Sequence, residues 1–176
     1  MRNINLDILL GEISAQSTFQ HSRLHGESHW LRVAKMGLEL ATRSQNYDPA
    51  IVFLFGALHD SMRQSEGRDP EHGMRAAQFA EKLNHHAFTL SDAQLDTLMF
   101  ACREHDYGKV TDDPTIGICW DSDRLNLWRV FIIPRPKYLS TAPAKQRKMI
   151  LRGLQVQSQS FNWHSLYRQF SELKAR

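Results

Sequence analysis

Four polar residues lie where a helix should bury apolar side chains, and all four are of types that bind divalent metals. They are His29, His59, Asp60 and Asp123. An isolated carboxylate or imidazolium inside a protein costs several kcal/mol, so such groups normally neutralise each other or bind a cation. Neutral imidazole nitrogens and ionised carboxylates are ligands of divalent transition metals. A single bound cation would therefore satisfy all four groups at once.

Two further histidines continue apolar stripes. His72 precedes the stripe that ends at Leu83, and His105 follows the stripe that ends at Cys102. A single histidine on an apolar face is more often a hydrogen-bonded core residue than a ligand, so the inference depends on the whole set occurring in one chain. The remaining histidines interrupt no stripe, and we interpret them as surface or structural residues: His21, His25, His85, His86 and His164.

The choice between Asp121 and Asp123 cannot be made from spacing. Two residues that are separated by one position on a helix differ by roughly 200° in direction. Apolar side chains lie on both of the faces concerned. Periodicity therefore leaves either carboxylate as the partner of the histidines.

Helix starts are marked by an Asp-Pro dipeptide that occurs at residues 48–49, 69–70 and 113–114, and by a capping box over residues 91–94. Asp accepts hydrogen bonds from the free amides of a first helical turn, where Pro has no amide to leave unpaired. With the apolar periodicity, these starts predict an all-α fold. The expected helices cover residues 6–16, 26–42, 50–60, 70–83, 92–105, 114–128, 144–157 and 162–173.

The length of 176 residues suits one domain with a single sizeable core. Residues 1–134 carry 13 Lys/Arg and 18 Asp/Glu, whereas residues 135–176 carry 9 Lys/Arg and 1 Asp/Glu. We therefore predict a helical domain over residues 1–134 and a basic C-terminal arm over residues 135–176 that packs on it or extends from it. The acidic body argues against nucleic acid as a partner, while the arm could contact an acidic surface.

The sequence shows neither an export signal nor a membrane span. Asp7 would interrupt the apolar core of a signal peptide, and the longest apolar run, Ile51–Leu58, is far short of the ~18 residues that a spanning helix needs. We expect a cytoplasmic protein. Cys102 and Cys119 each lie within an apolar helical pattern, which predicts two reduced core thiols rather than a disulfide.

Three short segments resemble the H…HD…D signature of the HD-domain metal-dependent phosphohydrolases. They are residues 29–33 (HWLRV), 58–60 (LHD) and 123–125 (DRL), and the likeness extends from residue 23 to about residue 130. The resemblance implies an all-helical HD-domain bundle and the hydrolysis of phosphate esters, mostly of nucleotides. Residues 67–73 and 119–125 are also similar to a small-protein subgroup of that superfamily. The last forty residues have no counterpart in the signature.

The resemblance also implies a metal site. Its D-R-L placement favours Asp123 over Asp121, so the expected ligands of a divalent ion are His29, His59, Asp60 and Asp123. Members with two metals have extra histidines between the HD pair and the last Asp, and His72 and His105 occupy such places. The expected cofactor is therefore one or two ions of Mn, Fe, Zn, Ni, Co or Mg.

The expected chemistry is metal-assisted hydrolysis. A bound metal would lower the pKa of water from about 15.7 toward about 7 and polarise a phosphoryl oxygen. We expect Asp60 to orient the attacking water, and His72, His105 and Arg63 to stabilise negative charge on the phosphate. Arg32 is equally compatible with a surface position, and Glu66 is better explained as a solvated loop carboxylate than as an acid or base.

The predicted function is a phosphatase or phosphodiesterase that acts on a small phosphorylated substrate such as a nucleotide. The alternative is a non-catalytic sensor, in which the pocket binds a nucleotide or metal and the basic tail contacts a partner. Residues 145–154 suit a cationic amphipathic helix, although a solvated face of a packed helix has the same pattern. Nucleic-acid binding by the tail lacks a recognised motif. An apolar tail helix could also mediate a homodimer.

Overall fold

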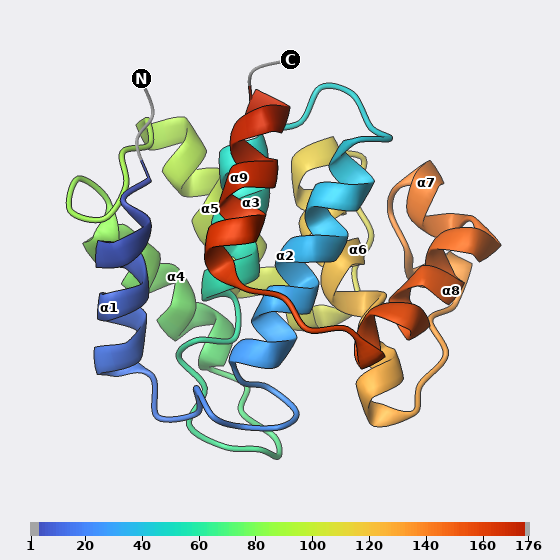
Figure 1. Cartoon of the computed structure of the whole chain (residues 1–176), viewed down its shortest axis with the longest axis horizontal. Coiled ribbons are helices and arrows are strands. Elements are labelled where there is room, and N and C mark those ends of the chain that lie inside the picture. Colours follow the sequence, from blue (N-terminus) through green and yellow to red (C-terminus); the bar gives the residue numbers. More distant parts are fainter. Residues whose placement is uncertain (1–3, 175–176) are drawn as a thin grey trace.

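The structure, a computed structural model, describes residues 4–174 as a bundle of α-helices (Figure 1). The α-helices of this part of the chain are α1 (Leu6–Gln16), α2 (Glu27–Ala41), α3 (Pro49–Leu58), α4 (His72–Leu83), α5 (Asp92–Glu104), α6 (Pro114–Arg124), α7 (Ala142–Lys145), α8 (Arg147–Gln155) and α9 (Trp163–Lys174). The same residues contain two isolated β-bridges and no strand. The predicted all-α fold class is therefore confirmed. No helix in this range combines the length and apolar character needed to cross a bilayer.

Two of the three Asp-Pro pairs start helices in the predicted manner. The Asp48 side chain accepts a hydrogen bond from the amide of Ala50 at 2.9 Å, and the Asp113 side chain accepts one from the amide of Ile116 at 2.9 Å. In the predicted capping box at α5, the side-chain oxygen of Gln94 accepts from the Ser91 amide. The local capping chemistry thus fixes where α3, α5 and α6 begin.

Several predicted boundaries are wrong by two residues or more, and α3, for example, ends at Leu58 rather than at residue 60. Helix α4 begins at His72 rather than at Pro70, because the Asp69 carboxylate accepts hydrogen bonds from Arg75 and the Gln64 amide instead of capping the helix. Helix α6 ends at Arg124, four residues early, and a 3-10 helix follows at Leu127–Val130. The single helix predicted over residues 144–157 is divided into α7 and α8, because Gln146 has an extended backbone.

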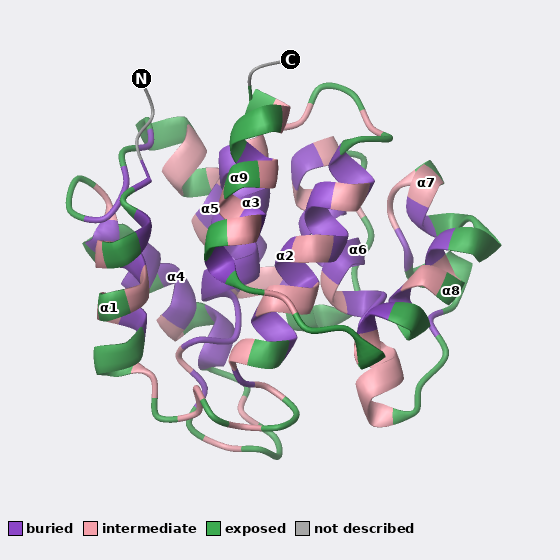
Figure 2. Ribbon diagram, in the orientation of Figure 1, coloured by how far each residue is buried: buried purple, intermediate pink, exposed green. Residues whose placement is uncertain are grey.

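Helix α3 forms the centre of the molecule. All of its residues from Ala50 to Leu58 are buried, which agrees with their apolar character on every side (Figure 2). Helices α2, α5, α6 and α9 pack around it. A Cβ atom on Gly56 would lie 2.7 Å from both Cα and Cβ of Ala34, so a glycine is needed for α3 to approach α2 this closely. This contact fixes the spacing of the two helices that carry His29 and His59.

The C-terminal segment packs into the same core. Helix α9 lies over α3 in Figure 1, and the Phe53 ring contacts the rings of Trp163, Tyr167 and Phe170 at centroid distances of 6.0, 5.8 and 5.1 Å. Helix α8 is tied to α2 by the guanidinium of Arg152, which donates to both carboxylate oxygens of Glu39. The boundary proposed after residue 134 stays a prediction.

Cys102 and Cys119 are both buried and free, as predicted for reduced core thiols. Burial raises the pKa of each thiol, so both stay protonated at neutral pH. Residues 1–3, on which the expected absence of an export signal partly depends, lie outside the described residues.

Candidate metal centre

The ends of five helices meet at one end of the bundle and carry histidines and acids there. His29 lies in the first turn of α2, His59 directly follows α3, and His72 is the first residue of α4. His105 directly follows α5, and Asp123 lies in the last turn of α6. The first turn of α2 and the last turn of α3 are at the lower end of the bundle in Figure 1. We call these five residues, together with Asp60, the candidate centre.

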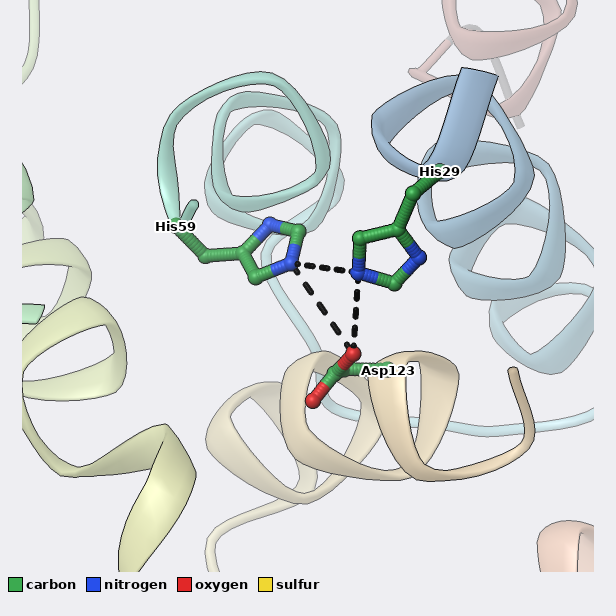
Figure 3. A group of neighbouring side chains, drawn as sticks. All are labelled: His29, His59 and Asp123. Carbon is green, nitrogen blue, oxygen red and sulfur yellow. Dashed lines mark hydrogen bonds and ion pairs between the residues drawn. The ribbon is translucent and has the colours of Figure 1, made fainter. Parts of the chain in front are cut away.

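His29, His59 and Asp123 converge on one point from three helices (Figure 3). The two Nε2 atoms of the histidines are 3.2 Å apart, and Oδ1 of Asp123 lies 3.2 Å from Nε2 of His29 and 3.9 Å from Nε2 of His59. Two ligand atoms at bonds near 2.1 Å lie roughly 3.0–3.4 Å apart for right-angle to tetrahedral arrangements. Two of the three separations fall in this range, and the third, 3.9 Å between Asp123 and His59, is about half an ångström longer. The three atoms are therefore close enough to share one ion.

Asp60 lies between this group and a second pair of histidines. Its Oδ2 atom is 3.6 Å from Nε2 of His29, while its Oδ1 atom is 3.2 Å from Nε2 of His72 and 3.6 Å from Nε2 of His105. The Nε2 atoms of His72 and His105 are 3.1 Å apart. The two carboxylate oxygens of Asp60 thus face different histidine pairs, an arrangement that suits a bridging ligand.

Backbone carbonyls fix the tautomers of three of these histidines. Nδ1–H of His59 donates to the Phe55 carbonyl, Nδ1–H of His105 to the Cys102 carbonyl, and Nδ1–H of His72 to the Asp69 carbonyl. When such a ring is neutral, Nδ1 carries its one N–H and the lone pair of Nε2 points into the centre. Histidines that bind metals are usually held in this way by their second nitrogen.

The electrostatics favour the protonation states that bind metals. Burial lowers the pKa of His29 to about 4 and that of His59 to about 3, so both rings are neutral at pH 7. Burial alone would raise the pKa of Asp60 and of Asp123. The hydrogen bonds and charges of the surrounding histidines, with Arg129 beside Asp123, outweigh it and lower both values. Two neutral imidazoles and two carboxylates therefore surround the centre.

One carboxylate oxygen that points into the centre has no hydrogen-bond partner in the protein. Oδ1 of Asp123 is buried and accepts no hydrogen bond, although Nε2 of His29 lies 3.2 Å away. The Nε2 atoms of His72 and His105 lie 3.1 Å apart, and Oδ1 of Asp60 is 3.2 and 3.6 Å from them. Burial would lower the pKa of His105, but the hydrogen bond and charge of Asp60 outweigh it and raise the pKa. A cation placed between the two rings would be held by both Nε2 atoms in place of a proton. The residues present therefore fit a divalent metal.

Asp121 lies apart from the centre. Its carboxylate accepts hydrogen bonds from the amides of Ser140 and Thr141, at 2.7 Å each, and from the Thr141 hydroxyl at 2.8 Å. Burial raises its pKa, although these hydrogen bonds act in the opposite direction. The structure thus gives Asp121 a structural task next to the N-terminus of α7 and points Asp123 at the histidines.

His25 is a correction to the sequence analysis, which interpreted it as a surface or structural residue. Its Nδ1 lies 3.1 Å from Oδ2 of Asp60, and its side chain is only 14% exposed. His25 precedes α2, so helical periodicity gave no signal for it. A Cβ atom on Gly26 would lie within 2.7 Å of backbone atoms of Gln20 and Ser22, so a glycine permits the tight fold that brings His25 to the centre.

Two arginines border the centre on different sides. Nη1 of Arg63 is 3.9 Å from Oδ1 of Asp60, and the side chain is almost fully buried, as expected for a residue near the site. Nη1 of Arg129 is 3.7 Å from Oδ1 of Asp123, a contact that the sequence did not predict. Glu66 is exposed to solvent. Arg32 is half-buried, and this burial lowers the pKa of its guanidinium.

Among solved structures, the chain is similar to a predicted HD superfamily hydrolase from an uncultured Thermotogales bacterium. The match covers 96% of this chain and 92% of that chain, with a TM-score of 0.64 and 23% sequence identity. This likeness shows that the chain has an HD-domain-like fold, as the sequence motif implied. No protein-family model matches the sequence, and no curated protein matches it.

Proposed function

We propose that this chain is a metal-dependent phosphohydrolase whose first metal is held by His29, His59, Asp60 and Asp123. The observation that carries the proposal is the convergence of two neutral imidazoles and Asp123, whose Oδ1 atom has no hydrogen-bond partner, with Asp60 beside them. The HD-domain-like fold supports it, because the structural neighbour is itself described as a predicted hydrolase of the HD superfamily.

A second ion would be held by His72, His105 and the same Asp60. The two oxygens of Asp60 face the two histidine pairs separately, and the Nε2 atoms of His72 and His105 lie 3.1 Å apart. A carboxylate with this placement can contact two ions at once. We therefore expect the loaded protein to hold up to two metals.

Hydrolysis needs an oriented water and a stabilised phosphate. A bound divalent metal supplies Lewis acidity and lowers the pKa of water. In the proposed reaction the water oxygen bonds to phosphorus while the ester P–O bond breaks, and the leaving oxygen takes up a proton. Asp60 accepts a hydrogen bond from the water, and His25 holds Asp60 in place through Nδ1. The buried Arg63 guanidinium neutralises charge that develops on the phosphate.

A panel of phosphate monoesters and diesters, nucleotides included, tests the proposal. The protein purified without chelator should release phosphate, lose this activity on chelation, and regain it with Mn²⁺ or Fe²⁺. The His59→Ala variant should be inactive, whereas the His164→Ala variant, which changes an exposed histidine, should match the wild type. Tight nucleotide binding without turnover would favour the sensor instead.

A further inference from the structure

A cavity of about 330 Å³ opens beside the candidate centre, on the side of α4. Its wall includes Arg63, Arg68, His72, Arg103 and Tyr107. We call it the arginine pocket. His72 and Arg63 belong to both places, since Nε2 of His72 and Nη1 of Arg63 lie 3.2 and 3.9 Å from Oδ1 of Asp60. The pocket therefore continues outward from the centre and does not include His29, His59 or Asp123.

The arginine pocket has an excess of positive charge. Asp69 in its wall is neutralised by Arg75, whose guanidinium donates to both carboxylate oxygens. Asp106 is the other acid in the wall, and it is exposed. Arg103 shares Glu104 with Lys109, so that one carboxylate serves two cations. Arg68 forms no hydrogen bond or ion pair within residues 4–174. The wall thus contains three arginines and two acids, and one of those acids, Asp69, is paired with Arg75.

Arg63 has unused hydrogen-bonding capacity although it is buried. Only 7% of its surface is exposed, its Nε has no partner, and Nη2 makes a long hydrogen bond of 3.4 Å to the Gly67 carbonyl. A buried guanidinium with free N–H groups is costly unless a ligand completes it. Its planar set of donors matches the oxygen atoms of a phosphate.

The first turn of α4 supplies a second, independent anion-binding feature. No side chain caps this 12-residue helix, and Gly73, in its first turn, lines the pocket. Free backbone amides and the helix dipole favour an anion at such a position. A Cβ atom on Gly73 would lie 2.6 Å from the Cys102 carbonyl oxygen, so this residue must stay small where α4 meets α5. The cavity, the arginines and the helix terminus all favour an anionic ligand such as a phosphoryl group.

We propose that the arginine pocket binds a phosphoryl group that is not cleaved, while another phosphoryl group of the same substrate occupies the candidate centre. This inference rests on the proposed phosphohydrolase function. It assigns the substrate to compounds that carry at least two phosphoryl groups. A simple monophosphate held at the centre would leave Arg68 without an anionic partner, whereas a second phosphoryl group could occupy the arginine pocket.

Binding of inorganic pyrophosphate to the metal-free protein tests the pocket without any catalysis. Calorimetric titration should show binding that is at least tenfold weaker in the double variant Arg68→Gln/Arg103→Gln. The Arg147→Gln variant, which removes an exposed arginine of α8, should bind like the wild type. Both pocket side chains reach solvent, so circular dichroism should show a folded double variant. Equal affinity of wild type and double variant, or no binding by the wild type, would overturn the inference.

A second measurement separates this inference from the proposed function. In the metal-loaded protein, the ratio of kcat/KM for a diphosphate over that for a monophosphate ester should fall at least tenfold in the double variant. An unchanged ratio in active protein would overturn the inference about the pocket but not the proposed phosphohydrolase function. Pocket-dependent pyrophosphate binding by a protein that hydrolyses no phosphate ester would overturn the proposed function, and the pocket would still be an anion-binding site.

Discussion

Asp121 and Asp123 are one residue apart and have different tasks. Asp121 accepts three hydrogen bonds from Ser140 and Thr141, whereas Oδ1 of Asp123 faces two histidines and accepts none. The difference arises because two helical residues that are separated by one position point in nearly opposite directions. Burial alone therefore does not identify a metal ligand. The neighbouring groups of each carboxylate distinguish the candidate ligand from the structural acid.

Replacing Asp121 by Asn should reduce stability without removing metal. Each carboxylate oxygen of Asp121 accepts one backbone N–H bond, and the side-chain nitrogen of Asn can only donate. One of the two backbone donors therefore loses its partner at a cost of about 1–3 kcal/mol. Urea denaturation should show this loss, and elemental analysis should show the metal content of the wild type. A stable Asp121→Asn protein that lacks metal would mean that the two acids have been assigned the wrong way round.

The candidate centre could be predicted from sequence wherever a regular helix displayed the residue. His29, His59, His72 and His105 all extend apolar stripes, and the structure brings all four together. His25 and Arg129 were missed because neither was recognised as extending the apolar stripe of a predicted helix. Their directions depend on tertiary contacts, such as the hydrogen bond from Nε of Arg129 to the Leu24 carbonyl, which no periodicity contains.

At the scale of elements, the α2–α3 contact positions the first two histidines. Replacing Gly56 by Ala places a methyl group 2.7 Å from Cα of Ala34, so the helices must separate. We expect a loss of roughly 1–3 kcal/mol, together with weaker metal binding. Gly11→Ala is the matched control, because nothing lies within 4 Å of the new methyl group, and it should stabilise α1 by roughly 0.5–1 kcal/mol. Equal stability of both variants would contradict this role of Gly56.

The ion pair between α2 and α8 predicts a pH dependence. Burial would raise the pKa of Glu39, but the Arg152 hydrogen bonds and the Lys35 charge outweigh it and lower the pKa below the ordinary value of 4.5. A lowered folded-state pKa means that the stabilisation is complete above pH 4.5 and disappears as the pH falls through the folded-state value. Glu39→Gln should therefore cost about 1 kcal/mol at pH 7 and progressively less below pH 4.5.

Denaturant titrations between pH 7 and pH 3 check this dependence. Glu81→Gln, which changes an exposed acid on α4, serves as the control and should leave the curve unchanged. A stability difference between wild type and Glu39→Gln that stays constant down to pH 3 would exclude the Glu39–Arg152 pair as its source.

The element boundaries show how far local rules extend. Caps at Asp48 and Asp113 could be predicted because a helix start depends on neighbouring residues only. Asp69 is also followed by proline, yet its carboxylate accepts a hydrogen bond from Arg75 in α4 instead of capping the helix. Helix α4 therefore begins only at His72. Just after the end of α6, the backbone packs closely against α8, which is distant in sequence. A Cβ atom on Gly153 of α8 would lie 2.2 Å from the Leu125 carbonyl oxygen, and local sequence rules contain no such contact.

At the scale of the whole molecule, the C-terminal segment is part of the core. Phe170 is 3% exposed and stacks on Phe53 of the central helix at 5.1 Å. Phe170→Ala should therefore cost about 3–5 kcal/mol, whereas Leu154→Ala, which truncates a 45% exposed side chain on α8, should stay within about 0.5 kcal/mol of the wild type. Thermal denaturation of both variants compares them. Similar melting temperatures would mean that α9 contributes little to the fold.

The proposed function depends on a cation at the point where five helix ends meet. The most direct test is the metal content of protein that has been purified without chelator and analysed by elemental mass spectrometry. The account predicts at least one divalent transition metal per chain in the wild type and in His164→Ala. It predicts a loss of metal in His59→Ala and Asp123→Ala, with helical content retained in both. Unchanged metal content in those two folded variants would contradict it.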